Sequence, residues 1–251
     1  MPAVDSGIAG RVVIVTGAGH GIGRGVALAF AEEGAHVALL GRTPERLAET
    51  ERLLTERGYR SLALPCDVRS ASEVDAAVAR VLDAHGRIDV LINNAGVFVW
   101  RPFVALTEED WDRTLDTNLK GCFLCAKAVV PAMSQRKWGR IVNVSSIHGR
   151  VGDKNVAAHC AAKFGLIGLT QSLARELREH NITVNAVLPG AVDNKDEAVT
   201  AEPPAAPLVA KLVPRQVARL CVFLASDDAA SITGASIDQL GGTDLAVIST
   251  K

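Results

Sequence analysis

The chain has 251 residues, of which 48% are hydrophobic and 22% charged, and its formal net charge at pH 7 is −1. This length and composition favour one large α/β domain with a substantial core and argue against disorder. Because there is no basic excess, a nucleic-acid binder is disfavoured. The five cysteines, an odd number, do not indicate a disulfide framework. Aromatic residues are scarce at 4%, and the chain has a single tyrosine, Tyr59.

The sequence contains no clear targeting, membrane or metal signal. Its first residues, MPAVDSGIAGR, do not combine a basic and an apolar region as a secretory signal does, and no apolar run is long enough to span a membrane. Cys122 and Cys125 form one CxxC pair inside an apolar stretch, which favours core packing over a zinc site. We therefore expect a cytoplasmic protein with reduced thiols, no membrane partner and no bound metal.

Short apolar runs alternate with longer amphipathic segments along the whole chain. The runs that predict strands cover residues 12–15, 36–40, 61–66, 88–92, 140–144, 182–188 and 235–239. The segments that predict helices cover residues 26–33, 44–58, 70–85, 107–137, 155–180 and 214–225. Ser70 and Glu73 have the spacing of a capping box at the start of one helix. The alternation predicts an α/β fold with a doubly wound parallel sheet of the Rossmann type, in a single domain over residues 1–251.

A glycine-rich turn, TGAGHGIG at residues 16–23, joins the first predicted strand to the first predicted helix. Glycines allow the backbone to approach a diphosphate closely, and the start of the helix offers free N–H groups and a positive dipole end. In this strand–turn–helix context the motif predicts nucleotide binding. The residues expected at the cofactor are Gly17, His20, Gly21, Ile22 and Gly23.

The residues after the second predicted strand select the type of dinucleotide. An acidic side chain there would bind the ribose 2′-hydroxyl, but this chain has Gly41 followed by Arg42. A guanidinium suits a 2′-phosphate, so NADP(H) is favoured over NAD(H) as the cofactor. The alternative interpretation is that Arg42 is a solvated residue at the start of a helix.

From about residue 10 to residue 244 the sequence resembles the short-chain dehydrogenase/reductase family. Beyond the glycine-rich turn, the motifs that carry this resemblance are CDV (66–68), NNAG (93–96), NLKG (118–121), GRIVNVSS (139–146), LPG (188–190) and FLASD…ITG…GG (223–242). The resemblance implies reversible hydride transfer between NADP(H) and a ketone or secondary alcohol, with a small molecule as the substrate. It also implies an assembly of identical subunits, a homotetramer or a homodimer, formed through the two long helices and the C-terminal strand region.

The resemblance also implies which residues bind the cofactor. Asp67 and Val68 would border the adenine, and Asn94, with Ala95 and Gly96, would lie beside the ribose. Pro189 and Gly190 would lie beside the nicotinamide. Residues 191–213, rich in proline and alanine, would form the lid over the substrate, with Asn194 in place of a threonine that relatives use to contact the cofactor.

The implied catalytic residues are Asn118, Ser146, His159 and Lys163. Asn118 would lie at a helix kink and hold a proton-relay water, Ser146 would bind the substrate oxygen, and Lys163 would bind the nicotinamide ribose. The family's YxxxK motif has its tyrosine thirteen residues after that serine, and this chain has His159 there, four residues before Lys163. Tyr59 lies outside the motif and cannot replace it.

Histidine at this position changes the acid–base chemistry. Imidazole has a reference pKa of about 6.5 against about 10 for phenol, and a lysine one helical turn away lowers it further. A neutral ring accepts a proton from an alcohol but is a poor proton donor in carbonyl reduction. Three alternatives remain open: an active oxidoreductase using His159, an NADP-binding protein with non-redox activity or a silent subunit, and an ordinary reductase with one replaced residue. His148 is either a substrate contact or an auxiliary proton carrier, or it is an exposed loop histidine.

Overall fold

Seven parallel strands form the central sheet in the computed structural model of the protein, which describes residues 6–243. Their order across the sheet is β3-β2-β1-β4-β5-β6-β7. The strands are β1 (Val12–Thr16), β2 (His36–Gly41), β3 (Ser61–Pro65), β4 (Val90–Asn93), β5 (Gly139–Val144), β6 (Ile182–Pro189) and β7 (Ser236–Gln239). Each of these strands lies within two residues of a run that the sequence predicts, so the doubly wound parallel sheet is confirmed.

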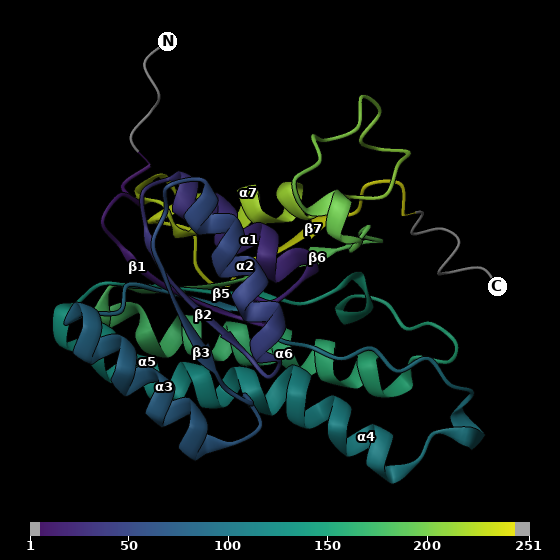
Figure 1. Ribbon diagram of the computed structural model, residues 1–251. Helices are drawn as coiled ribbons and strands as arrows, with labels where there is room; N and C mark the ends of the chain where they lie inside the picture. The colour runs from purple at the N-terminus through teal and green to yellow at the C-terminus, as the bar shows by residue number, and fades with distance from the viewer. Residues whose placement is uncertain (1–5, 244–251) are drawn as a thin grey trace.

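The helices cover both faces of the sheet (Figure 1). They are α1 (Gly21–Glu32), α2 (Pro44–Glu56), α3 (Ala71–His85), α4 (Glu108–Leu115), α5 (Gly121–Arg136), α6 (Ala157–Glu176) and α7 (Pro214–Ala225). Helices α1, α2 and α7 pack on one face, and α3, α5 and α6 pack on the other. Within residues 6–243, no helix has both the length and the apolar character needed to cross a membrane.

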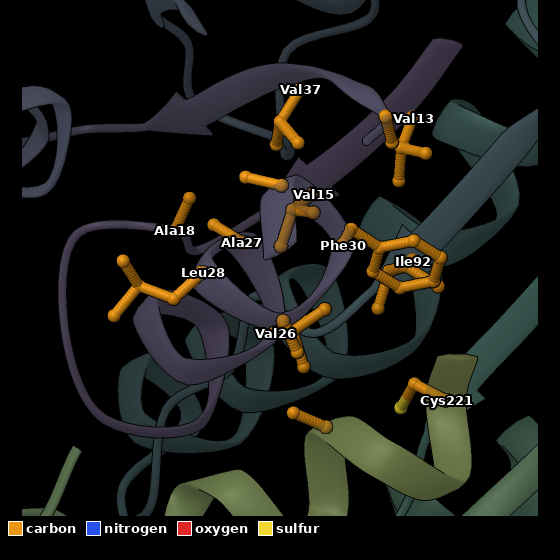
Figure 2. Packing of buried hydrophobic residues seen from close by; sticks show 14 of the residues in the cluster. Val13, Val15, Ala18, Val26, Ala27, Leu28, Phe30, Val37, Ile92 and Cys221 are labelled. Carbon is orange, nitrogen blue, oxygen red and sulfur yellow. The ribbon is translucent and has the colours of Figure 1, made fainter. Parts of the chain in front are cut away.

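The core consists of two hydrophobic clusters, one on each face of the sheet. In β1, Val13 and Val15 belong to the cluster under α1 and α7, whereas Val12 and Ile14 belong to the opposite cluster. Side chains of a strand alternate between its two faces, so a strand covered on both sides must be apolar at every position. Figure 2 shows the first cluster, where Val13 and Val15 lie near Phe30 of α1.

The strand order reverses at β1, and this reversal positions the functional site. The chain runs outward from β1 to β2 and β3, then crosses back to place β4 on the other side of β1. In doubly wound sheets, ligands bind in the crevice that opens beyond the carboxyl ends of the two strands at such a switch point. Here those ends are Thr16 of β1 and Asn93 of β4.

The first helix begins at Gly21, five residues earlier than the sequence predicts. Glycine has a low helix propensity, so the propensity pattern excludes Gly21, Gly23 and Gly25. Tertiary packing requires them nonetheless: a Cβ on Gly25 would lie 2.8 Å from the Cβ of Pro214 on α7. Close approach of two helices therefore outweighs local propensity here.

The segment predicted as one helix over residues 107–137 is interrupted. A single π turn, Asp116–Lys120, separates α4 from α5, and the Gly121 N–H donates to the carbonyl of Asp116. Such turns contain one residue more than an α-helical turn and bend the helix. The turn contains Asn118, so the bend lies where the resemblance implies a kink.

A predicted helix start and a predicted helix cap also differ from the structure. The helix predicted from residue 155 begins at Ala157, because Asn155 has a left-handed backbone conformation (φ 66°), and its last turn, Leu177–His180, is a 3-10 helix. The capping box is half formed: Ser70 accepts the N–H of Glu73, but the Glu73 carboxylate accepts the N–H of Asp67 instead.

Candidate active site

A cavity of about 860 Å³ opens at the carboxyl ends of the central strands. This volume falls within the range typical of cofactor and small-molecule sites. Of the residues that the sequence predicts to bind or react, those that line the cavity are Gly17, His20, Ile22, Gly23, Arg42, Val68, Asn94, Ala95, Gly96, Asn118, Ser146, His159, Lys163, Pro189 and Gly190. Gly21 and Asp67 are not among its lining residues.

The glycine-rich turn is packed too closely to tolerate side chains. A Cβ on Gly23 would lie 2.1 Å from the carbonyl oxygen of Gly17, which itself has a positive φ of 66°. Asn94 stabilises the turn, since its Nδ2 donates to the carbonyls of Thr16 and Gly17 at 3.0 and 3.3 Å. The turn between β1 and α1 therefore lines the cavity without a Cβ at Gly17 or Gly23, as a phosphate-binding turn requires.

Gly21 and Asp67 contact other parts of the protein and do not line the cavity. A Cβ on Gly21 would lie 2.7 Å from Oδ1 of Asn194, so this glycine makes room for residues 191–213. The Asp67 carboxylate accepts two hydrogen bonds from Nε of Arg69 and one from its Nη2, the latter at 2.6 Å. The guanidinium of Arg69 lowers the pKa of Asp67 and holds its side chain at the start of α3.

Basic side chains gather at the end of the cavity between the glycine-rich turn and α2. His20, Arg42 and Arg46 all line this end, together with Thr43. Burial lowers the pKa of His20, and the Arg46 cation lowers it further. The sequence reasoning missed Arg46, although a second arginine in the first turn of α2, four residues after Arg42, is a usable signal.

Asn118 is fully buried and is held on both edges of its amide by one backbone residue. Its Oδ1 accepts the N–H of Val97 at 2.7 Å, and its Nδ2 donates to the carbonyl of Val97 at 2.8 Å. The same Nδ2 lies 3.3 Å from Nδ1 of His159. The π turn thus connects the segment after β4 to α6 through a single side chain.

Lys163 lies one helical turn after His159 and is also buried. Its Nζ donates to the carbonyl of Val144, the last residue of β5, at 2.8 Å. The Oγ of Ser145 donates to the carbonyl of Lys163 at 3.2 Å, so α6 and the end of β5 are bonded in both directions. Burial lowers the pKa of Lys163.

The ring of His159 is neutral at physiological pH. Burial lowers its pKa to about 3, and the nearby Lys163 and His148 act in the same direction. The carbonyl of Val97 acts in the opposite direction but is the weakest of these influences. Only 7% of the residue is exposed, and that part faces the cavity.

Three aromatic rings form one cluster at the outer end of the cavity. The ring centroids of Phe98 and His148 lie 4.9 and 5.7 Å from that of His159, both edge-on. His148 also places its Nε2 3.9 Å from the carboxylate of Asp153, and its backbone N–H donates to Oγ of Ser146 at 3.2 Å. His148 is therefore part of the site rather than an exposed loop histidine. Phe98, which is 59% exposed, was missed because a lone aromatic after a strand carries no motif.

The first residues of the segment 191–213 line the other side of the cavity. The two ends of this segment are joined by a β-bridge between Val192 and Leu212, and Asn194 lines the cavity. Thr243 lines it too, and its Oγ1 accepts the N–H of Ala191 at 2.8 Å. Thr243 was missed because it is 52 residues away in sequence from the backbone that it supports.

A glycine-rich turn at the switch point of a parallel sheet, opening on a cavity with a buried lysine, defines a ligand-binding α/β protein of the doubly wound class. A model of the short-chain dehydrogenase family matches residues 11–203, and the chain belongs to this family. The family that the sequence motifs indicate is therefore confirmed, as is the expectation of an enzyme of this family.

Named relatives span nearly the whole chain. The oxidoreductase UcpA of Salmonella typhimurium is 40% identical over 95% of this chain and 96% of its own length. The 3-oxoacyl-[acyl-carrier-protein] reductase FabG of Staphylococcus aureus is 40% identical over 92% of this chain and 97% of its own. The crystal structure of a short-chain type dehydrogenase/reductase from Mycobacterium marinum aligns with a TM-score of 0.87 at 31% identity, covering 95% and 96% of the two chains. The chain is thus an oxidoreductase-family protein along its length.

Proposed function

We propose that the protein is an NADP(H)-dependent oxidoreductase that interconverts a small ketone and a secondary alcohol, with His159 in place of the usual tyrosine. The observation that carries this proposal is the shared cavity: Ser146, His159 and Lys163 line the same space as the glycine-rich turn. A cofactor bound on that turn and a substrate oxygen near His159 would therefore meet in one cavity.

The residues present fit a nicotinamide dinucleotide. The close backbone packing at Gly17 and Gly23 is the cradle that a diphosphate needs. Arg42 and Arg46 both line the cavity, and two guanidinium groups there would suit an adenosine 2′-phosphate, which favours NADP(H) over NAD(H). Asn94 and Lys163 would hold the nicotinamide ribose. When bound, this cofactor gives a hydride to the substrate carbon or takes one from it.

The chain's own groups would bind and orient the substrate oxygen. Ser146 already accepts a hydrogen bond from the N–H of His148, so its hydroxyl hydrogen remains to donate to that oxygen. His159, neutral and edge-on to Phe98, would contact the same oxygen. Residues 191–213 would act as the lid that excludes water.

Turnover measurements test this proposal. Ketones would be offered with NADPH and alcohols with NADP⁺, to the native protein and to His159→Gln. We expect turnover that falls by about a hundredfold or more in the variant, the usual contribution of a positioned acid–base group. His180→Gln is the matched control, because His180 is an exposed histidine that does not line the cavity. Native protein that binds NADPH without turning over any substrate, while His159→Tyr reduces ketones, would overturn the proposal.

One observation favours a second candidate function. With a pKa of about 3, His159 carries no ionisable proton near neutral pH, so it cannot serve as a strong acid in carbonyl reduction. An NADP-binding protein with non-redox activity, or a silent subunit of an active relative, would tolerate such a residue. The His159→Tyr experiment distinguishes this candidate from an active enzyme.

We also propose that the protein assembles with copies of itself, as a homotetramer or a homodimer. Phe123 on α5 and Phe164 on α6 are 44% and 46% exposed. Exposed large apolar side chains on long helices are typical of a surface that packs against another protein chain. Light scattering of the native protein and of Phe123→Glu tests this: the native protein should scatter as an oligomer, and the variant should dissociate. A native monomer would contradict it.

A further inference from the structure

The orientation of the Asn118 amide is chemically determined. A backbone N–H can only donate and a carbonyl oxygen can only accept, so the amide oxygen must face the Val97 N–H and the amide nitrogen must face the Val97 carbonyl. Both contacts are short, at 2.7 and 2.8 Å. Reversing the amide would place two donors together on one side and two acceptors on the other.

This orientation determines what His159 meets at Nδ1. The group 3.3 Å from that ring nitrogen is the Nδ2 of Asn118, which is an NH₂ and therefore only a donor. Nδ1 must then be the unprotonated, accepting nitrogen of the neutral ring. In a neutral imidazole the other nitrogen, Nε2, carries the hydrogen.

We infer that Asn118 is a positioning residue that holds His159 in the Nε2–H tautomer, so that His159 presents a hydrogen-bond donor and not a base. The chemical class that suits such a group is a carbonyl oxygen, which accepts hydrogen bonds and gains negative charge when hydride reaches its carbon. In this tautomer Nε2 neither takes the hydroxyl proton of an alcohol nor gives up its own hydrogen, so the proton that the substrate oxygen gains in reduction or loses in oxidation would be exchanged with solvent water. This consequence for the substrate depends on the proposed function, whereas the tautomer itself does not.

The other groups around His159 leave this assignment in place. Lys163 of α6 and His148 of the segment after β5 both disfavour a positive charge on the ring and so keep it neutral. Asp153 faces His148, at 3.9 Å, and not His159. The Val97 carbonyl would favour a hydrogen on the ring, but it is the weakest of the influences on His159 and its hydrogen bond to the Asn118 amide is short, at 2.8 Å. Phe98 contributes no polar atom.

Nitrogen NMR of the protein labelled with ¹⁵N-histidine tests the tautomer directly. The six histidines give overlapping signals, and comparison with His159→Gln assigns those of His159. We expect Nδ1 to resonate as an unprotonated nitrogen and Nε2 as a protonated one, with and without NADP⁺. A protonated Nδ1 in the native protein would overturn the proposal.

A pair of variants tests the role of Asn118. Asn118→Ala should remove the preference of His159 for the Nε2–H tautomer and so raise the population of the Nδ1–H tautomer. Cys122→Ser should leave the His159 spectrum unchanged. Cys122 lies one helical turn after Asn118, and its thiol donates to the backbone carbonyl of Asn118 and not to the side-chain amide. An unchanged tautomer in a folded Asn118→Ala would contradict the assignment, and if that variant does not fold, the native spectrum still decides. Because turnover is not the readout, an inactive protein with the Nε2–H tautomer would refute the proposed function alone.

Discussion

The guanidinium of Arg24 on α1 lies 2.9 Å from the carboxylate of Asp196, so the helix behind the glycine-rich turn is joined to the segment 191–213. The two partners differ in exposure: 5% of the Arg24 side chain is exposed, against 74% for Asp196. Arg24 also donates to Oγ1 of Thr50 on α2 at 3.1 Å and to the carbonyl of Gly19 at 2.7 Å. One buried arginine thereby connects the turn, α2 and the proposed lid.

Replacing the two partners should therefore have unequal effects on stability. Arg24→Leu leaves Thr50 and Gly19 without their donor and should lower the free energy of unfolding by about 2–4 kcal/mol. Asp196→Asn removes an exposed charge and should cost less than about 1 kcal/mol. Urea unfolding of both variants measures the difference. Equal losses would mean that the ion pair, and not the buried hydrogen bonds, holds this region.

The basic end of the cavity gives a prediction about cofactor choice. Arg42→Ala and Arg46→Ala should each raise the KM for NADPH about ten- to a hundredfold, the effect of losing one charge-assisted hydrogen bond, and leave that for NADH nearly unchanged. Arg52→Ala is the matched control, since Arg52 is exposed on the same helix and pairs with Glu49 and Glu56. Equal use of NADH and NADPH that neither cavity variant alters would exclude a 2′-phosphate site here.

The glycine-rich turn gives a prediction about packing. Gly23→Ala places a Cβ against the Gly17 carbonyl and should destabilise the protein by about 3 kcal/mol or more while abolishing cofactor binding. Gly168→Ala, in α6, meets nothing within 4 Å and should stabilise by about 0.5–1 kcal/mol. Thermal unfolding and NADPH titration check both. A fully stable, cofactor-binding Gly23→Ala would show that the turn has more room than its backbone indicates.

The low pKa of His159 predicts how stability depends on pH. Above about pH 6.5 the ring is neutral in both the folded and unfolded chain and contributes no pH dependence. Below that value His159 is protonated in the unfolded chain but stays neutral in the folded chain down to about pH 3. The free energy of unfolding therefore falls as the pH is lowered. Relative to His159→Gln, the native protein should lose up to about 1.4 kcal/mol per pH unit in this window. Parallel curves from urea unfolding between about pH 7 and about pH 4.5 would contradict this.

The sequence predicts the strands well because their pattern and their environment agree. A β-branched run such as Val12–Thr16 is buried on both faces, so no competing signal is present. The start of α1 could not be predicted in the same way, since Gly21 and Gly23 are disfavoured in helices and are there for contacts with Asn194 and Gly17. Only the folded chain reveals such contacts.

The site was predictable where residue type and motif spacing together specify a position. His159 and Lys163 share a helical face because they are four residues apart, and both line the cavity. Phe98 and Thr243 line it through tertiary placement alone, which no local pattern encodes. The contact between Asn118 and His159, 41 residues apart, likewise depends on how α6 packs against the π turn.

The π turn between α4 and α5 limits insertions and deletions of residues in this part of the chain. Residues 116–120 hold one residue more than a regular turn, and each residue of an α-helix rotates the chain by about 100°. Removing one residue here would restore a continuous helix and rotate Asn118 away from Val97. Substitutions on the exposed face of this turn, such as at Lys120, disturb none of that geometry. A substitution at Lys120 would thus keep the geometry, whereas a deletion of one residue would not, so the number of residues in the turn is constrained as well as their identity.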